Sequence, residues 1–216
     1  MGAKSIKLSK LPRLIAIMGG SAAGKTYLAA MLERHLPGEV LRLSLDNFYR
    51  DRSSCSPALR QRINFDHPRA IDWDALEAAL VQLAKGRPAR IPQYDFATHS
   101  RLAQPLIVQP HPIVLVEGLW PLHRARIRRL FDYSIFLACP ATARLRRRLE
   151  RDVAERGRTP ASVRHQFLQT VSPMHRKYVA PQTLWSDLVV RRTLLIRDIA
   201  QLAKTIEQEP IKEKQL

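Results

Sequence analysis

Residues 14–26, Leu-Ile-Ala-Ile-Met-Gly-Gly-Ser-Ala-Ala-Gly-Lys-Thr, decide the fold of this 216-residue chain. The first five residues are apolar and indicate a buried strand, and the next eight fit the pattern G-x-x-x-x-G-K-[ST] without a gap. In this motif the backbone turns tightly around phosphate groups at the start of a helix. Lys25 would reach the β- and γ-phosphates, and the Thr26 hydroxyl would bind Mg²⁺. The sequence therefore predicts a nucleotide-binding loop made of Gly19, Gly20, Ser21, Ala22, Ala23, Gly24, Lys25 and Thr26.

Short apolar runs alternate with amphipathic stretches along most of the chain. The runs indicate strands at 14–18, 40–44, 113–116, 134–138 and 187–190. The amphipathic stretches indicate helices near 25–36, 72–85, 141–156, 160–171 and 195–207. Strands that alternate with helices predict the α/β class, with a parallel sheet flanked by helices on both faces.

The segment 87–109 breaks this alternation. It holds two extended pieces around a polar Ala-Thr-His-Ser-Arg turn, which predicts a β-hairpin appended to the sheet. We expect a single domain over 13–207, preceded by a flexible basic lead-in at 1–12 and followed by a frayed tail at 208–216. Asp72 is the expected N-cap of the second helix, and Gly86 is its expected stop.

The bulk charge is unusual, with 36 Lys and Arg against 19 Asp and Glu and a net charge of +17. Such a field attracts polyanions, either nucleic acid or phosphorylated metabolites. Twelve arginines lie between Arg124 and Arg164 among predicted helices, without zinc-finger spacing, a leucine zipper or an RNA-recognition motif. We therefore do not expect nucleic acid to be the partner.

The cysteine content and the hydropathy suggest a compartment. Cys55 and Cys139 lie far apart, lack metal-ligand spacing and are expected to be free thiols in a reducing compartment. No apolar run approaches the roughly 20 residues that cross a membrane. We expect a cytoplasmic protein that does not interact with membranes.

A carboxylate, Asp46, lies just past the predicted strand 40–44, at the edge where open α/β sheets bind ligands. There it can accept a proton from an incoming hydroxyl group, although an Asp at this place can also simply cap the following turn. The segments 64–68 and 91–101 interleave aromatic residues with Asp and His, which suits a flat base and a sugar. Taken singly, each of these residues is more often a core aromatic or a turn residue.

Together these segments resemble uridine–cytidine kinases, within the wider phosphoribulokinase/uridine kinase group of P-loop kinases. The resemblance covers residues 14–190. Besides the loop, it rests on Asp-x-Phe-Tyr at 46–49, Asn-Phe-Asp-His-Pro at 64–68, Ile-Pro-x-Tyr-Asp-Phe-x-Thr-His-Ser-Arg at 91–101, Val-Glu-Gly at 116–118, Arg-Arg-Leu-Glu-Arg-Asp-x-x-Glu-Arg-Gly-Arg at 147–158 and Pro-Met-His at 173–175. It implies a nucleoside-monophosphate-kinase-like sheet, an acceptor-binding hairpin, an arginine-rich helical lid over 141–166, and ATP, or GTP, with Mg²⁺.

The resemblance also implies roles for individual residues. Asp46 would be the general base toward the ribose 5′-hydroxyl, and Lys25, Arg151 and Arg156 would be the other catalytic residues. Thr26, Asp46 and Glu117 would hold the metal. The substrate-binding residues would be Tyr49, Phe65, Asp66, Tyr94, Phe96, His99, Arg148, Arg158 and Gln166. Two other arginines of the predicted lid, Arg146 and Arg147, are expected on the solvated surface.

The sequence thus predicts ATP-dependent phosphorylation of uridine or cytidine, and the resemblance suggests a homotetramer. One alternative is a kinase of another small alcohol or sugar phosphate, similar to phosphoribulokinase, glycerate kinase or pantothenate kinase. Another is a nucleotide-dependent RNA-binding or regulatory module. Two departures from the family pattern stand out. Leu45 replaces a glutamine common before the catalytic Asp, and the usual Pro-Arg-Gly-x-x-Asn loop is absent after Val190.

Overall fold

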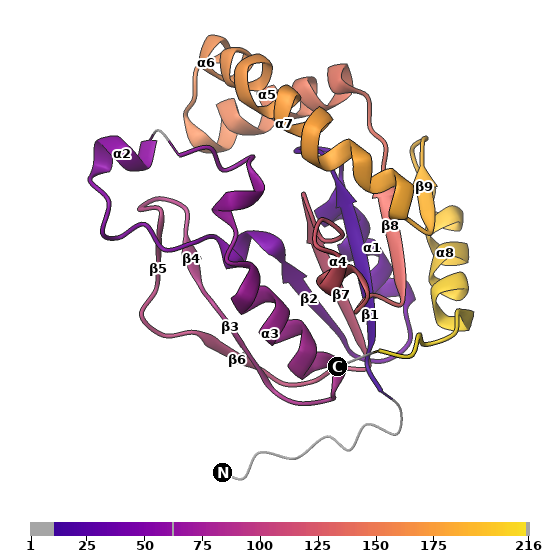
Figure 1. The fold of residues 1–216 in the computed structure, drawn as a ribbon. Coiled ribbons are helices and arrows are strands. Elements are labelled where there is room, and N and C mark those ends of the chain that lie inside the picture. Colours follow the sequence, from indigo (N-terminus) through magenta and orange to yellow (C-terminus); the bar gives the residue numbers. More distant parts are fainter. Residues whose placement is uncertain (1–10, 62, 215–216) are drawn as a thin grey trace.

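A computed structural model describes residues 11–61 and 63–214 (Figure 1). The expected basic lead-in at 1–12 therefore lies almost wholly outside the described residues. Five parallel strands form the central sheet in the order β2-β7-β1-β8-β9. They are β1 (Arg13–Gly19), β2 (Val40–Ser44), β7 (Ile113–Gly118), β8 (Tyr133–Leu137) and β9 (Leu188–Val190). The predicted parallel sheet is confirmed, and β1, which carries the glycine-rich loop, lies at its centre.

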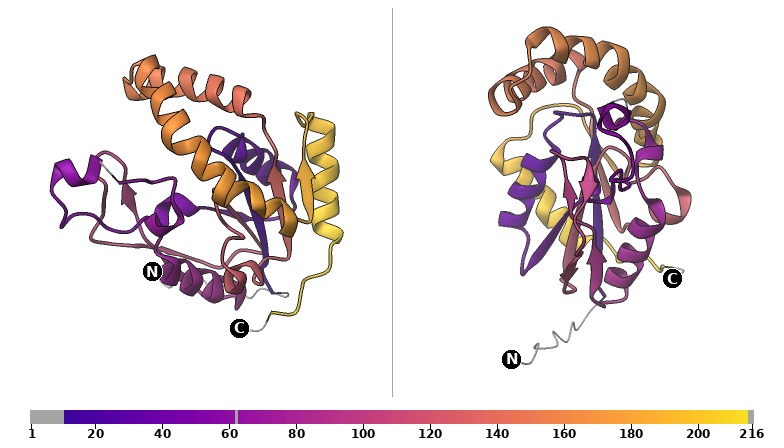
Figure 2. Two further views of the ribbon diagram at one scale, coloured as in Figure 1. Left: turned by 45° about the horizontal axis from the view of Figure 1, so that its top comes forward. Right: turned by 90° about the vertical axis from the view of Figure 1, so that its left-hand side faces the viewer.

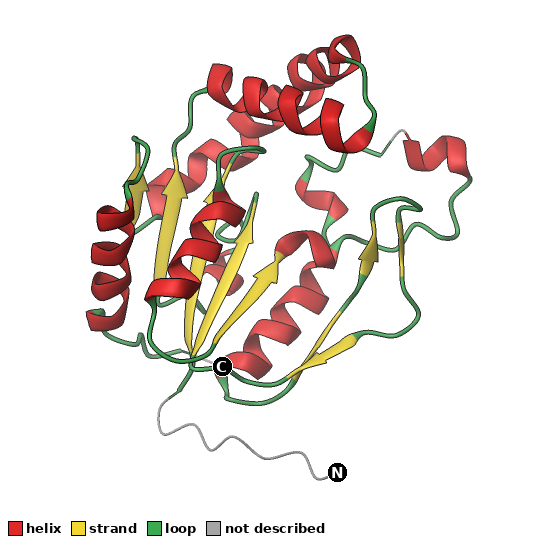
Figure 3. Cartoon of the chain, turned by 180° about the vertical axis from the view of Figure 1, so that it is seen from behind, coloured by secondary structure: helices red, strands yellow, loops and turns green. Residues whose placement is uncertain are grey.

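Helices cover both faces of this sheet (Figures 2 and 3). The core helices are α1 (Lys25–His35), α3 (Trp73–Ala84), α4 (Ala125–Arg128) and α8 (Ile196–Gln208). Leu14, Ala16 and Met18 of β1 pack in the cluster with α3 and α4, whereas Ile15 and Ile17 pack in the cluster with α1 and α8. Alternate residues of one strand thus fill two cores, because successive side chains of a strand point to opposite faces.

The second helix has the caps that the sequence indicates. The Asp72 side chain accepts a hydrogen bond from Ala75 N at 3.2 Å. Gly86 follows the helix with a φ of 68°, in the left-handed region that favours glycine. The expected N-cap and the expected stop of this helix are both present.

A helical layer lies over the carboxyl ends of the strands (Figure 1). It begins with α5 (Ala141–Arg156) and α6 (Pro160–Gln166), continues through Phe167–Val171, α7 (Ser172–Met174) and His175–Val179, and ends with the 3₁₀ turns of Ala180–Trp185. The helix expected at 160–171 is therefore too short, because the helical run continues to Trp185. Pro173 and Pro181 do not break it, since each falls in the first turn of a new helical piece, where a proline is tolerated.

The predicted hairpin is a twisted ribbon beside α3 (Figure 1). It consists of two antiparallel pairs, β3 (Ala89–Ile91) with β6 (Leu106–Val108), and β4 (Tyr94–Asp95) with β5 (Ser100–Arg101). Each pair is a separate two-stranded sheet, so among the described residues the hairpin is not hydrogen-bonded to the central sheet. The hairpin is confirmed, whereas its attachment to the sheet is not. Its side chains instead pack on α3, as buried Ala89 and Ile91 do.

The chain after α8 returns to the amino-terminal ends of the strands. Lys212 N donates to Asp132 Oδ1 at 2.9 Å, and Lys214 Nζ pairs with Asp132 Oδ2 at 2.8 Å. Asp132 is buried and also accepts a hydrogen bond from Leu14 N at 2.8 Å. The tail was expected to be frayed, and these contacts contradict that expectation for its described part. No helix in residues 11–61 and 63–214 has the length and apolarity needed to cross a membrane.

Candidate active site

The loop of residues 19–26 joins β1 to α1 with an unusual backbone. Ala22 and Gly24 have φ values of 61° and 99°. Gly20 is required by close approach, because a Cβ there would lie 2.6 Å from Arg144 Nη1 and 2.8 Å from His175 Cδ2. Lys25 Nζ donates to the Gly20 carbonyl at 3.1 Å. Gly24 has no side chain to cap α1, so the first N–H groups of this helix face the cavity as anion donors.

Two carboxylates follow the neighbouring strands β2 and β7. Ser44 accepts the hydrogen bond from Asp46 N at 3.3 Å, so the cap of this turn is Ser44 rather than Asp46. The Asp46 side chain faces the cavity instead. Both oxygens of Glu117 lie within hydrogen-bond reach of Thr26 Oγ1, at 2.8 and 2.9 Å. Glu117 therefore contacts the loop directly and does not merely cap its own strand.

The electrostatics of this group favour a bound cation. Burial raises the pKa of Asp46, and Lys25 opposes that shift. Burial likewise raises the pKa of Glu117, opposed by the Thr26 hydrogen bond and by Lys25. Burial lowers the pKa of Lys25, although Glu117 and Asp46 pull it back. A divalent ion would favour the ionised form of both carboxylates.

The donor set fits Mg²⁺ only as part of a larger coordination shell. Thr26, Asp46 and Glu117 supply hard oxygen donors, which Mg²⁺ prefers. Within the described ranges, no group of three or more His, Cys, Asp or Glu side chains is placed to hold a metal ion by itself. The remaining ligands would have to be water and substrate phosphate oxygens, which is the usual arrangement for Mg²⁺ bound with a nucleotide.

Aromatic rings line the cavity beyond Asp46. His99 stacks on Phe65 with ring centroids 4.6 Å apart and an interplanar angle of 21°. Tyr49 contacts Tyr94 at 5.3 Å, and Phe96 contacts Tyr94 at the same separation. The rings come from the turn after β2, the segment before α3 and the hairpin. Three distant segments of the sequence thus form one flat-walled pocket.

Two polar atoms in this pocket have no partner. The Tyr94 hydroxyl and His99 Nδ1 are buried without a hydrogen bond to any described residue. An unpaired buried polar atom costs about 1–3 kcal/mol. Asp66 also lines this part of the cavity, and burial raises the pKa of its carboxyl group. The pocket therefore offers flat apolar walls with three polar groups, which suits a ligand with a planar ring and polar edges.

Four arginines of the lid converge on one buried carboxylate. Asp152 is fully buried, with Arg151 at 2.8 Å, Arg148 at 3.2 Å, Arg156 at 3.4 Å and Arg158 at 3.7 Å. The sequence analysis did not assign a role to Asp152. Its spacing of four residues from Arg148 and from Arg156 on one helix is the signal that could have identified it. Asp152 holds the four guanidinium groups together at the mouth of the cavity.

Arg148 connects the lid to the glycine-rich loop. Its Nη1 donates to Ser21 Oγ at 3.0 Å, and its Nη2 donates to Gln166 Oε1 at 2.8 Å. Arg158 Nη1 donates to the same oxygen of Gln166 at 2.5 Å. The two arginines and Gln166 therefore form one unit, and the lid rests on the loop through Ser21.

Two further residues at the loop, Arg144 and His175, were given no role from the sequence. Arg144 is buried, and its guanidinium lies 5.5 Å over the Phe167 ring beside Gly20. His175 lies against the same glycine, and burial, together with Arg144 and Lys25, lowers its pKa to about 4. Arg147 was expected on the solvated surface, and it is exposed, although it also lines the cavity with Nη1 at 3.5 Å from the Ala22 carbonyl. Charge counting alone could not separate the inward Arg144 from the outward arginines.

A single cavity of about 1160 Å³ brings most of the predicted site residues together. It is lined by Ser21, Ala22, Gly24, Lys25, Thr26, Asp46, Tyr49, Phe65, Asp66, Tyr94, Phe96, His99, Glu117, Arg148, Arg151, Arg156, Arg158 and Gln166. Gly19, Gly20 and Ala23 belong to the same loop but do not line this cavity. Its lining residues come from the ends of the strands and from the helical layer above them, and Figure 3 shows how these elements are arranged.

An adjoining cavity of about 690 Å³ shares Gly24, Tyr27 and Arg147 with the first. Its other side is formed by the short connection from β9 to α8, residues 191–194. Arg192 holds this connection by a bidentate pair with Asp198, at 2.6 and 2.9 Å. The segment that replaces the usual family loop is therefore locally fixed.

The α/β sheet with a glycine-rich loop, two strand-end carboxylates and an arginine lid defines a P-loop phosphotransferase. Comparison with known proteins then identifies the family. The model of the Phosphoribulokinase / Uridine kinase family matches residues 14–199, and the chain belongs to this family.

Sequence relatives and solved structures agree with this assignment. A uridine kinase of Chloroflexus aurantiacus is 39% identical over 183 residues, covering 84% of this chain and 88% of the relative. A uridine kinase of Deinococcus deserti is 39% identical over 180 residues, covering 83% and 87%. Phosphoribulokinase from Rhodobacter spheroides has a similar fold, with a TM-score of 0.63 at 18% identity over 87% of this chain and 74% of that one.

Proposed function

We propose that the chain transfers the γ-phosphoryl group of ATP to the 5′-hydroxyl of uridine or cytidine and releases the nucleoside monophosphate. The observation that carries this proposal is that Asp46 shares one cavity with the phosphate-loop Lys25 and with the aromatic pocket around Tyr94 and His99. A phosphoryl donor and a planar acceptor would meet at that carboxylate. The 39% identity to curated uridine kinases over most of the chain supports the same acceptor.

The nucleotide would bind with its phosphates in the loop of residues 19–26. Lys25 and the N–H groups at the start of α1 would contact the β- and γ-phosphates. The base would occupy the adjoining cavity beside Tyr27 and Arg147, against the connection at residues 191–194. Because that connection differs from the usual family loop, GTP should be compared with ATP as the donor.

Magnesium would be held by Thr26, Asp46 and Glu117, in part through water. When bound, it neutralises charge on the phosphate oxygens. The raised pKa values of Asp46 and Glu117 support this placement, because a nearby cation would stabilise the ionised form of both carboxylates.

The acceptor would lie with its base between the rings of the aromatic pocket. Tyr94 Oη and His99 Nδ1, which have no partner among the described residues, would hydrogen-bond to the polar edge of the pyrimidine. Asp66 would hold the sugar hydroxyls, and the ring stack of His99 on Phe65 would position the base.

Asp46 would accept the proton of the 5′-hydroxyl as that oxygen attacks the γ-phosphorus. Burial raises the pKa of Asp46 toward the working pH, which makes it a better base than a fully solvated carboxylate. Arg151 and Arg156 would neutralise the charge that spreads over the transferring phosphoryl group. The reaction is thus mostly positioning and charge stabilisation by this chain's own residues.

The test is a coupled kinase assay with ATP or GTP over a panel of nucleosides, sugar phosphates and small alcohols. Uridine and cytidine are expected to give kcat/KM at least about a hundredfold above ribulose 5-phosphate, glycerate and pantothenate, because only a pyrimidine nucleoside pairs with the buried Tyr94 and His99 atoms. A sugar phosphate as the preferred acceptor would overturn the proposal.

Two secondary expectations accompany the reaction. The free thiols Cys55 and Cys139 support a reducing compartment, and we place the enzyme in the cytoplasm. The resemblance to uridine–cytidine kinases supports a homotetramer. Light scattering after size exclusion gives the mass directly, and a monomer at micromolar concentration would contradict the assembly.

A further inference from the structure

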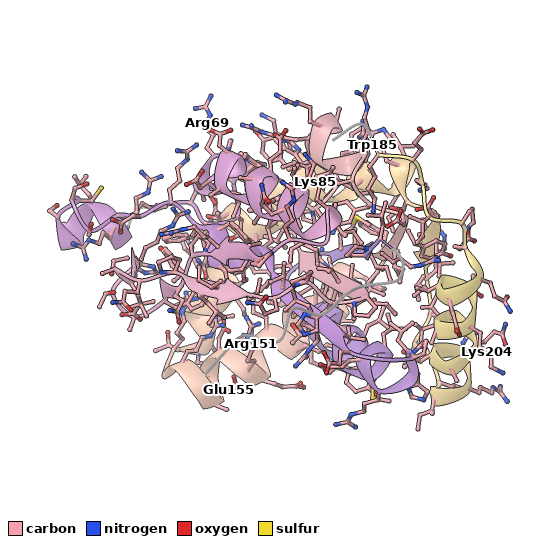
Figure 4. All side chains as sticks on the ribbon, turned by 90° about the horizontal axis from the view of Figure 1, so that it is seen from below. Arg69, Lys85, Arg151, Glu155, Trp185 and Lys204 are labelled. Carbon is pink, nitrogen blue, oxygen red and sulfur yellow. The ribbon has the colours of Figure 1, made fainter. Side chains whose placement is uncertain are left out.

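A second basic cavity lies on the outer side of the acceptor pocket. It has a volume of about 510 Å³ and is lined by Arg50, Arg52, Arg69 and Arg124, together with His67 and Tyr178. None of these residues lines the nucleotide or acceptor cavities. Figure 4 shows Arg69 at the edge of the molecule, well apart from Arg151 of the lid. The cavity is therefore separate from the candidate active site.

The arginines of this cavity lack a buried counter-charge. Arg124 pairs with Asp74 at 3.7 Å, but the Asp74 side chain is 88% exposed, and such a pair contributes little. No carboxylate lines the cavity among the described residues. In the lid, by contrast, four arginines share the fully buried Asp152.

The nearest acidic neighbours in the sequence are engaged elsewhere. Asp51 lies between Arg50 and Arg52, yet its carboxylate accepts hydrogen bonds from Ser53 and from the backbone of Arg101. Asp72 pairs with the Arg101 guanidinium at 3.0 Å. Neither carboxylate neutralises the cavity.

The two histidines of the cavity, His67 and His123, do not offset the charge of the arginines. Burial, Arg69 and Lys177 lower the pKa of His67, and burial, Arg124 and His67 lower the pKa of His123. Both shifts agree with a local excess of positive charge, because nearby cations disfavour the protonated ring.

The shape of the cavity favours phosphate groups over nucleic-acid bases. Trp73 is only 3% exposed, with Arg124 5.3 Å over its ring. The Tyr178 hydroxyl and His67 Nε2 are hydrogen-bonded to each other at 3.0 Å. Trp73 is thus packed in the core, and the half-buried rings of His67, His123 and Tyr178 pack against one another and against Trp73 rather than forming an open platform for a base, as single-stranded binding requires.

We propose that this cavity binds the oligophosphate part of a small molecule, either a free oligophosphate or the phosphate chain of a nucleotide. Arginine suits this role because its planar group binds phosphate oxygens in a bidentate manner. A concave site of this volume encloses a small ligand. The cavity is a binding site of its own, and it does not depend on the proposed kinase reaction.

The site is formed by the same chain segments that carry residues of the acceptor pocket. Arg50 directly follows Tyr49, and His67 directly follows Asp66. Arg50 N donates to Ala70 O at 2.8 Å, which joins the two segments. A ligand held between Arg50 and Arg69 would restrain both segments that carry the acceptor-binding side chains, so it is expected to change KM for the nucleoside.

The test is calorimetric titration with tripolyphosphate. Wild type is expected to show two sites per chain, one at the glycine-rich loop and one at the new cavity. The triple variant Arg50→Ala, Arg69→Ala, Arg124→Ala should retain only the loop site, because each lost charge-assisted contact weakens binding about tenfold or more. The matched control replaces three exposed arginines outside the cavity, Arg34→Ala, Arg87→Ala and Arg197→Ala, and lowers the net charge equally.

The outcomes separate the possible ligands. If the second site binds tripolyphosphate and nucleoside triphosphates with equal affinity, it recognises the phosphate groups alone. If it binds the nucleotides more tightly, it also contacts the base. Both results support the proposal. A single site in wild type, or equal loss of binding in the triple variant and its control, would overturn it. The proposal would also be overturned if a 20-nucleotide RNA bound to wild type but not to the triple variant while tripolyphosphate did not bind at this cavity. Thermal unfolding of each variant confirms that the chain is folded.

Discussion

Replacing Asp152 with Asn is expected to damage stability and catalysis together. Asp152 is fully buried in α5 and holds four arginines within 3.7 Å. The Arg148 side chain is 8% exposed, while those of Arg151, Arg156 and Arg158 are 32%, 55% and 30% exposed. The variant removes the negative charge but keeps the size of the side chain, so any loss of stability comes from the lost charge and not from a void in the packing.

The magnitude follows from the burial of each pair. Breaking a buried ion pair on one side costs about 3–5 kcal/mol, because an uncompensated charge stays behind. The three more exposed pairs are screened by water and contribute about 0–1 kcal/mol each. The pair with Arg148 therefore dominates. At about 2–4 °C per kcal/mol for a chain of this size, Tm is expected to fall by about 6–20 °C.

Catalysis should suffer as well, because Asp152 fixes Arg151 and Arg156, which we propose neutralise the transferring phosphoryl group. Misplacement of a catalytic group by about 1 Å can cost about a hundredfold in rate. At assay temperatures below the unfolding transition, we therefore expect kcat to fall about a hundredfold, with a smaller change in KM for ATP. This split is the signature of a positioning residue rather than a purely structural one.

Thermal unfolding and steady-state kinetics on the same preparations check both effects. The control is Glu150→Gln on the same helix, whose exposed side chain lies 3.9 Å from Arg146 and should change Tm by less than about 2 °C. If Asp152→Asn keeps its Tm within 3 °C of wild type, or keeps kcat within about threefold, the argument from buried charge is refuted.

Four other variants test single features of the site. Asp46→Asn is expected to lower kcat about a hundredfold or more while the Kd for metal-free ATP stays nearly the same, and unaltered turnover would remove Asp46 from the role of base. His99→Ala should raise KM for uridine about tenfold and leave KM for ATP within about twofold, so equal changes would contradict the pocket assignment. Gly118→Ala should destabilise the fold by about 1–3 kcal/mol, because the new Cβ would lie 2.3 Å from the Leu45 Cβ; recovery in the double variant with Leu45→Ala checks this clash in urea unfolding. The pKa of His175 is lowered to about 4 from 6.5. Between these two values the unfolded chain binds more protons than the folded chain, so the free energy of unfolding decreases as pH falls. The urea midpoint of His175→Phe should therefore depend less on pH in this range than that of wild type, and parallel curves would refute the shift.

The sequence was most informative where chemistry is local. The glycine-rich loop, Lys25 and Thr26 lie within one turn between a strand and a helix, so their mutual geometry follows from the motif itself. Asp46 and Glu117 could be placed because parallel strands bring their carboxyl ends to one edge. The role of Leu45 could not be read in the same way. Its contact with Gly118 joins the turn after β2 to the end of β7, two segments that are distant in the sequence, and it shows that this departure from the family pattern is absorbed by packing.

The helical layer shows why other features escaped. Pro173 and Pro181 normally suggest breaks, yet local turns of wider and tighter pitch absorb them and the run continues to Trp185. Likewise, the spacing within 141–156 relates Asp152 to Arg148 and Arg156, but it does not show that Asp152 is buried or that Arg158 also approaches it from beyond the helix end at Gly157. Tertiary contacts of this kind are not contained in spacing.

The large positive charge can now be divided by what neutralises it. Asp152 offsets part of the charge of the four lid arginines from inside the protein and holds them in place before any nucleotide binds, so they lose little order when it does. Arg50, Arg52, Arg69 and Arg124 have no buried carboxylate partner among the described residues, and the pair of Arg124 with the exposed Asp74 offsets little of their mutual repulsion. The two sets should therefore respond differently to salt. Binding at the second cavity should weaken steeply as ionic strength rises, whereas the geometry of the lid, set by a buried carboxylate, should not.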